Sequence, residues 1–160
     1  MNRWTRANLL LAVMVAALLV AHLWPAGYSE HPPLTGLAEA EITAVRIERS
    51  DRLRLALQRD DKAWQLTHPQ QAPAQTQRVR QLLAIARAPV QQTFPATGDL
   101  ARYGLATPGA VLQLNKQRLL FGDRDPSQTS RYVLVNDRIS VIDDVYFNLL
   151  SLPASHFGAD

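Results

Sequence analysis

The sequence GDRDPS at residues 122–127 places three oxygen-bearing side chains at alternate positions, Asp123, Asp125 and Ser127. Alternating oxygen ligands are a feature of calcium-binding loops. The downstream glutamate and the central glycine of such loops are missing here, and Arg124 would lie among the ligands. A solvated turn therefore explains these residues better than a cation site does.

Other residue types that perform catalysis are present without the spacing that catalysis needs. Asp143 and Asp144 are adjacent and precede an apolar segment, which favours a helix N-cap pair over an acid–base pair. No serine lies in a GxSxG motif, and no glycine-rich loop precedes a Lys-Ser or Lys-Thr pair. The chain has no cysteine, and its histidines lack metal-ligand spacing. These histidines are His22, His31, His68 and His156. We therefore predict no catalytic residue, no cofactor and no metal.

Two arginine–tyrosine pairs are the best candidates for a binding surface. Arg102 is followed by Tyr103, and Arg131 is followed by Tyr132. A guanidinium beside an aromatic ring can form a stacking platform for a ligand or a partner. The alternative is that these side chains simply pack along the edges of a sheet.

The charge distribution argues against nucleic acid as a partner. The chain has 17 basic and 14 acidic residues, and every acidic residue follows Tyr28. Without Arg3 and Arg6, 15 basic residues remain against 14 acidic ones, so the body of the chain is nearly neutral. Charges of both signs are interspersed there, as on a solvated surface.

Residues 7–24 (ANLLLAVMVAALLVAHLW) form a long apolar segment of 18 residues. As a helix this segment would span roughly 27 Å, close to the thickness of the hydrocarbon core of a bilayer. Arg3 and Arg6 precede it, and no Lys or Arg follows until Arg46. The positive-inside rule then predicts a cytoplasmic N-terminus. We expect a signal anchor in a bacterial inner membrane, with the rest of the chain in the periplasm.

A cleavable signal peptide is the alternative, because a charged start and an apolar stretch suit both. Cleavage requires small residues before the cut, whereas the segment ends in Trp24, Pro25 and Ala26. Retention is therefore favoured. In a retained helix, four side chains could pack against a helix of a partner in the bilayer: Asn8, Ala12, Ala16 and Ala17.

The remaining residues predict an α+β domain of antiparallel meanders and hairpins, with about seven strands and two main helices. Apolar alternation and turn signals place seven strands at residues 42–48, 53–59, 63–67, 110–114, 119–122, 131–135 and 138–142. Residues 90–94 are a further candidate strand, with weaker alternation. Helical spacing places the helices at residues 73–88 and 145–152. Asn136-Asp137 is a tight hairpin signal.

These patterns divide the chain into five segments. We expect a cytoplasmic N-terminus at residues 1–6, the transmembrane helix at 7–24, a linker at 25–40, the periplasmic domain at 41–152 and a C-terminal tail at 153–160.

Several spaced residues form a larger pattern within the domain. The members are Trp64, Leu66, Pro69, Val79, Leu82, Leu83, then Asp99-Leu100-x-x-Tyr103-Gly104-Leu105-x-x-Pro108, then Gly122 and Arg131-Tyr132-Val133. This pattern resembles the family called domain of unknown function 4340, over about residues 42–150. The resemblance implies an exported domain anchored by one N-terminal helix, and some relatives accompany ABC-type transport components of the gliding-motility kind. It implies no catalytic residues.

Three functions are compatible with these features. The first is a non-enzymatic accessory subunit that the anchor holds beside an integral membrane protein, such as a component of an ABC-type transporter. The second is a periplasmic module that binds a small ligand or a component of the cell envelope through the two arginine–tyrosine pairs. The third, least favoured, is a hydrolase that uses Asp123, Asp125 or His68.

Overall fold

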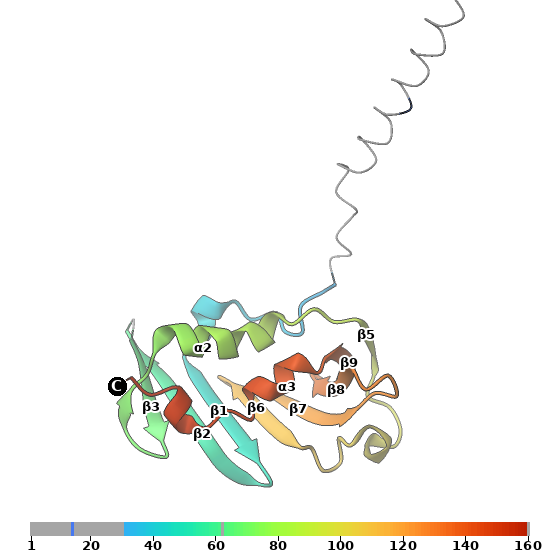
Figure 1. The fold of residues 1–160 in the computed structure, drawn as a ribbon. Helices are drawn as coiled ribbons and strands as arrows, with labels where there is room; N and C mark the ends of the chain where they lie inside the picture. Colours follow the sequence, from blue (N-terminus) through green and yellow to red (C-terminus); the bar gives the residue numbers. More distant parts are fainter. Residues whose placement is uncertain (1–13, 15–30, 62, 160) are drawn as a thin grey trace, which may run out of the picture. The chain divides into compact units, whose positions relative to one another are not determined.

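The computed structural model describes residue 14, residues 31–61 and residues 63–159 (Figure 1). The predicted anchor at residues 7–24, with its packing residues Asn8, Ala12, Ala16 and Ala17, lies outside the described residues except for Met14. In the part of the chain that is described, no helix has the length and apolar character needed to span a membrane. The described residues from His31 onward belong to one compact unit.

The described residues contain one antiparallel sheet of nine strands, in the order β4-β3-β2-β1-β6-β7-β8-β9-β5. The strands are β1 (Ala44–Arg49), β2 (Arg52–Asp60), β3 (Ala63–His68), β4 (Ala72–Pro73), β5 (Gln92–Pro95), β6 (Ala110–Leu114), β7 (Gln117–Arg124), β8 (Ser130–Val135) and β9 (Arg138–Asp143). The mixed α+β class and the antiparallel hairpins are confirmed. The expected number of strands was too low.

The difference in strand number comes from the two edges of the sheet. β4 has only two residues, which is too short to show any alternation in sequence. β5 starts two residues later than expected and pairs with β9, which is far from it in the sequence. An edge strand that pairs with a distant strand on one side alone leaves little periodic signal.

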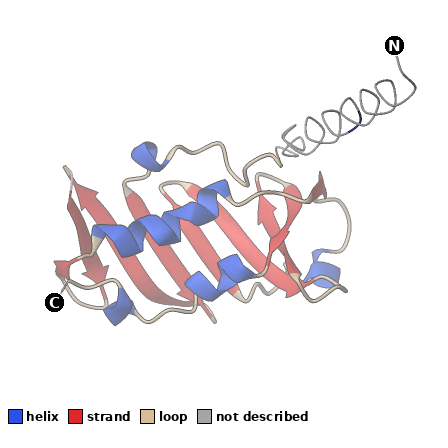
Figure 2. Cartoon of the chain, turned by 45° about the horizontal axis from the view of Figure 1, so that its top comes forward, coloured by secondary structure: helices blue, strands red, loops and turns tan. Residues whose placement is uncertain are grey.

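The helices are shorter than expected. α2 (Thr76–Leu83) begins three residues after Pro73, and residues Ala84–Arg87 continue as the 3-10 helix η2. α3 (Val145–Leu149) follows β9 directly. Both α-helices lie on the same face of the sheet (Figure 2). Their apolar side chains and the side chains of this face form the main core.

The two faces of the sheet therefore differ. The face that carries α2 and α3 is called the helix face, and its core includes Val45, Ile47, Leu112, Phe121 and Val133. The opposite face is called the open face. Because side chains alternate along a strand, each residue next to a core residue on these strands points to the open face.

Segments expected as linker and tail pack onto the domain. In residues 32–35, the Leu34 and Thr35 amides donate to the carbonyl groups of Ala88 and Ala86 at 2.9 Å each. Near the C-terminus, Phe157 is buried in the core, and its carbonyl oxygen accepts a hydrogen bond from the Gln75 amide at 2.8 Å. The folded unit thus extends beyond residues 41–152 at both ends.

Candidate functional site

A row of apolar side chains crosses the open face. Val111 of β6 pairs with Leu120 of β7, Leu120 with Leu134 of β8, Leu134 with Ile139 of β9, and Ile139 with Phe94 of β5. Directly opposed residues share a face, so the five side chains form one continuous apolar row. Ile139 is fully buried, whereas Val111, Leu120 and Leu134 are half-buried and reach solvent.

A basic row lies next to the apolar row. Arg46 of β1 pairs with Gln113 of β6, and Gln113 pairs with Arg118 of β7. Arg46 and Arg118, called the basic pair, are both exposed. Neither is among the ion pairs found between described residues. The open face therefore offers apolar side chains beside two exposed arginines, with Glu48 of β1 opposite Val111 on the same face.

Three aromatic rings end the apolar row. The ring of Tyr103 lies 4.9 Å from that of Tyr132 and 5.6 Å from that of Phe94, between centroids. Tyr103 comes from the 3-10 helix η3 (Leu100–Tyr103), whose first turn is capped because the Ala101 amide donates to Asp99 at 2.9 Å. Two of the predicted binding residues, Tyr103 and Tyr132, are thus brought together on the open face.

The loop after η3 passes so close to β7 that position 122 can hold only glycine. A Cβ atom on Gly122 would lie 2.1 Å from the Tyr103 carbonyl oxygen and 3.0 Å from the side chain of Leu105. Gly104, at φ 67°, turns the chain there in the left-handed region that suits glycine. The most specific part of the sequence pattern, residues 99–108 with Gly122, therefore builds the contact that places Tyr103.

These motif residues belong to the stretch that matches a known family. Residues 64–157 match the family described as Domain of unknown function (DUF4340). The chain belongs to the DUF4340 family. No curated protein and no solved structure matches it. The DUF4340 match begins in β3 and ends at Phe157, so it includes the packed tail, while β1 and β2 complete the same sheet before it.

The other two predicted binding residues of this DUF4340 domain do not join the tyrosines. Arg102 is exposed on η3, and it is not among the arginines that stack on an aromatic ring between described residues. Arg131 points to the helix face, because it is next to Tyr132 on β8. The structure therefore brings the two tyrosines together and places Arg131 on the opposite face of the sheet.

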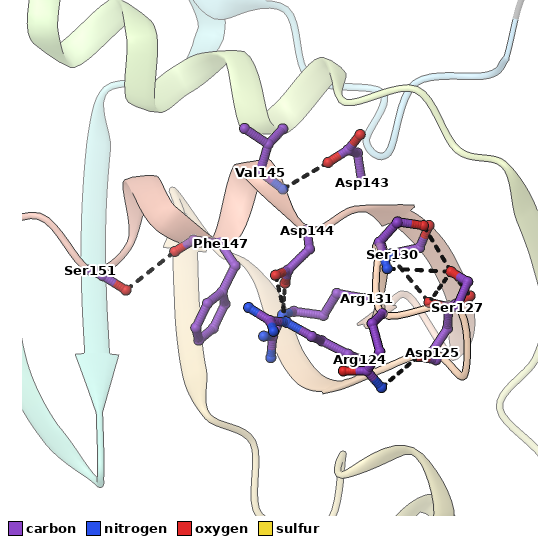
Figure 3. A network of polar contacts seen from close by, with 12 residues as sticks. Arg124, Asp125, Ser127, Ser130, Arg131, Asp143, Asp144, Val145, Phe147 and Ser151 are labelled. Carbon is purple, nitrogen blue, oxygen red and sulfur yellow. Dashed lines mark hydrogen bonds and ion pairs between the residues drawn. The ribbon is translucent and has the colours of Figure 1, made fainter.

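Arg131 lies in a buried ion-pair cluster under α3 (Figure 3). Its Nε donates to Asp144 at 2.5 Å and its Nη1 to the Gly122 carbonyl oxygen at 2.5 Å. Its guanidinium stacks 3.7 Å from the ring centroid of Phe147. Arg124 donates to the second oxygen of Asp144 at 2.7 Å. Asp144 thus holds two arginines in place, and both of its oxygens are used.

The two adjacent aspartates have different roles. Asp143 accepts a hydrogen bond from the Val145 amide at 2.8 Å and so caps the start of α3, as expected. The side chain of Asp144 makes no capping bond. Asp144 occupies the N-cap position of α3, as expected, but its side chain accepts from Arg124 and Arg131 instead, a convergence that the sequence does not reveal.

The GDRDPS segment covers the end of β7 and the first residues of the hairpin loop at residues 125–129, between β7 and β8 (Figure 3). The Ser127 hydroxyl donates to both oxygens of Asp125, at 2.7 and 2.9 Å, and the Ser130 amide donates to Asp125 at 3.2 Å. The Ser127 hydrogen bond, more than the backbone ones, holds the pKa of Asp125 below its ordinary value. These contacts fit the interpretation of the segment as a turn.

Among the described residues, no group of three or more His, Asp or Glu side chains is arranged to hold a metal ion. His31, His68 and His156 come from separate segments, and His22 lies outside the described residues.

Sequence reasoning missed the apolar row, although a signal for it exists. β7, β8 and β9 contain consecutive apolar residues, such as Leu119-Leu120 and Val133-Leu134, instead of strict alternation. Consecutive apolar residues in a strand indicate that both faces are covered or in contact with something. Here the second face is covered only in part.

Proposed function

We propose that this chain is a non-enzymatic accessory subunit, anchored in a bacterial inner membrane, that docks an integral membrane protein on the open face of its periplasmic domain. The observation that carries the proposal is the half-exposed apolar row next to the basic pair. Burial of apolar surface would supply most of the affinity, because it removes that surface from water. The charges would select the partner.

The chemistry of the face defines the partner. Arg46 and Arg118 would meet Asp or Glu side chains, and the half-buried members of the apolar row would meet aliphatic or aromatic ones. The partner therefore presents an apolar patch bordered by acidic residues outside the bilayer. The apolar sequence of residues 7–24 supports a partner in the same membrane. A component of an ABC-type transporter is the partner class that the family resemblance favours.

Two of the acidic side chains considered in the sequence, Asp125 and Asp144, are engaged by the fold, which supports a binding role over catalysis. Asp125 is held by the hydrogen bonds of its own loop, and Asp144 is used by two arginines. Side chains held in this way are structural, since a catalytic acid or base must reach a substrate atom.

The test uses site-specific photo-cross-linking in the native membrane with the full chain. A photoreactive residue at Leu120 should cross-link to an integral membrane protein, whereas one at Gln81, exposed on α2, should not. The double charge reversal Arg46→Glu and Arg118→Glu should abolish the Leu120 cross-link.

The matched control places two negative charges on the other side of the domain. Gln77→Glu with Gln81→Glu, both on exposed positions of α2, should leave the Leu120 cross-link unchanged. If the Leu120 cross-link forms equally well in the Arg46 and Arg118 variant, or if only soluble proteins are captured, the proposal is wrong.

A further inference from the structure

We propose that the domain has a second, separate site that binds a phosphate ester, in a basic pocket between the β1–β2 hairpin, the end of β3 and the segment after α3. The pocket has a volume of about 770 Å³, which is within the usual range for small-ligand sites. Its lining includes Arg49, Arg52, Arg54 and His68.

The charge of the lining points to an anion. Three arginines and one histidine line the pocket, and no acidic residue does; the neighbouring acids Glu48 and Asp51 are not part of the lining. None of the ion pairs between described residues involves these arginines. The pocket therefore gathers arginines that form no ion pair with a described acidic side chain.

The hairpin places two of these charges directly opposite each other. Ser50 and Asp51 have positive φ angles of 50° and 56° and form a tight turn, so Arg49 and Arg52 are cross-strand partners. Like charges in such a position destabilise a sheet. An anion bound between the two guanidinium groups would remove this repulsion, which gives the arrangement a physical reason.

Arg49 is held ready for a ligand. Its Nη1 donates to the Ser151 hydroxyl at 2.9 Å, and its guanidinium lies 5.5 Å from the ring centroid of Phe147. These contacts occupy one face of the planar Arg49 guanidinium and one of its N–H donors. Its other N–H groups can still donate to a ligand. A guanidinium donates paired hydrogen bonds to the oxygens of a phosphate, and several arginines together suit a group with more than one free oxygen.

The apolar residues of the lining favour a phosphate ester over inorganic phosphate. Leu53, Leu150 and Leu152 with Pro69 and Pro153 form an apolar wall beside the arginines. A ligand that carries an apolar group next to its phosphate would use both parts of the pocket. Either the headgroup of an anionic lipid or a soluble organic phosphate has this chemistry.

The pocket is independent of the proposed docking face. Arg49 contacts Phe147 of α3, and residues 150–154 follow α3, so the pocket lies on the side of the helix face. The open-face residues Leu120, Arg46 and Arg118 do not line it. Either proposal can fail without the other.

Calorimetric titration of the full chain in a non-ionic detergent tests the site. The probes are inorganic phosphate, hexyl phosphate and dihexanoylphosphatidylglycerol. We expect saturable binding of hexyl phosphate, about tenfold tighter than inorganic phosphate because the hexyl chain reaches the apolar wall. Tighter binding of the phosphatidylglycerol than of hexyl phosphate would identify a lipid as the source, and the reverse order a soluble phosphate.

Two triple variants, each of which loses three positive charges, test whether hexyl phosphate binds in the pocket. Arg49→Gln, Arg52→Gln and Arg54→Gln together should weaken hexyl phosphate binding by about tenfold or more. The matched control, Arg46→Gln with Arg87→Gln and Arg118→Gln, removes three exposed arginines elsewhere and should not change it.

A variant limited to the exposed Arg52 and Arg54 guards against a folding defect, since neither side chain is buried. Its thermal midpoint should not fall below that of the wild type, because loss of Arg52 relieves the repulsion across the hairpin, and it should still lose most of the binding. Equal weakening in the pocket variants and in the matched control, or no saturable binding of any probe, would overturn the proposal.

Discussion

At the scale of single residues, Asp144 joins two arginines in a largely buried ion-pair cluster outside the apolar core. Its side chain is 12% exposed and that of Arg131 is 11% exposed, and the two are joined at 2.5 Å. Asp144→Asn would leave Arg131 beneath α3 without its counter-charge. Removing one partner of a buried pair costs about 3–5 kcal/mol, so we expect a loss of that size in the free energy of unfolding, measured with urea.

The buried Arg131–Asp144 pair also predicts that substitution of the arginine costs less stability than substitution of the aspartate. Arg131→Met removes the buried charge and keeps an apolar side chain against Phe147, so it should cost less than Asp144→Asn. Asp61→Asn, on an exposed turn, is the control and should change stability by no more than about 0.5 kcal/mol. A greater loss for Arg131→Met than for Asp144→Asn would contradict the role given to Asp144.

Gly122 provides a second prediction at this scale. Gly122→Ala would force its Cβ into the Tyr103 carbonyl group, and overpacking of this kind costs about 1–3 kcal/mol. Thermal unfolding should show the loss, and the fluorescence of Tyr103 and Tyr132 should change because η3 must move. Gly36→Ala, where nothing lies within 4 Å of the added atom, is the matched control and should leave both quantities unchanged.

At the scale of elements, the β7–β8 loop depends on the ionised form of Asp125. Because hydrogen bonds lower the pKa of this group in the folded protein, the loop is stabilised above the ordinary Asp pKa and loses that contribution as pH falls through the lower folded value. Ser127→Ala removes the largest cause, so the Asp125 pKa should rise toward the ordinary value. An NMR titration of the Asp125 carboxyl carbon measures this pKa. An unchanged pKa in Ser127→Ala would contradict the role given to the Ser127 hydroxyl.

The C-terminal segment is an element that the sequence presents as a tail. Phe157 is buried, the Ala159 amide donates to the Pro73 carbonyl oxygen at 2.8 Å, and Arg78 donates to the His156 carbonyl oxygen. Phe157→Ala should therefore cost about 3–5 kcal/mol in a urea titration. The exposed Ser155→Ala should cost no more than about 0.5 kcal/mol. A cost near zero for Phe157→Ala would show that the segment is only a tail.

Local signals predicted the elements that are built from neighbouring residues. Asn136 and Asp137 have φ angles of 48° and 58°, as a tight hairpin turn requires, and the alternation in β1 to β3 predicted that meander. β4, β5 and the segment at residues 32–35 depend on partners far away in sequence, which leave no periodic trace. The opposite directions of Arg131 and Tyr132 already follow from alternation in the predicted strand at residues 131–135. The convergence of Arg124 and Arg131 on Asp144 depends on how distant segments pair, which residue types do not reveal.

At the scale of the whole molecule, the two faces of the sheet have different chemistry. The helix face is closed by α2, α3 and the terminal segments, and its margin holds the basic pocket. The open face retains an apolar row whose middle residues are half-buried. A sheet needs only one covered face for a stable core, so the second face is free to serve a partner.

The predicted anchor gives the final prediction, which concerns the chain as a whole. A tether raises the effective concentration of the domain near a partner in the same membrane. Deletion of residues 1–24 should therefore reduce the Leu120 cross-link, and replacement of residues 7–24 by an unrelated apolar helix should restore it. Incomplete restoration would assign a packing role to Asn8, Ala12, Ala16 and Ala17, because only these specific contacts would be lost. An undiminished cross-link after deletion would contradict both the anchor and the membrane partner.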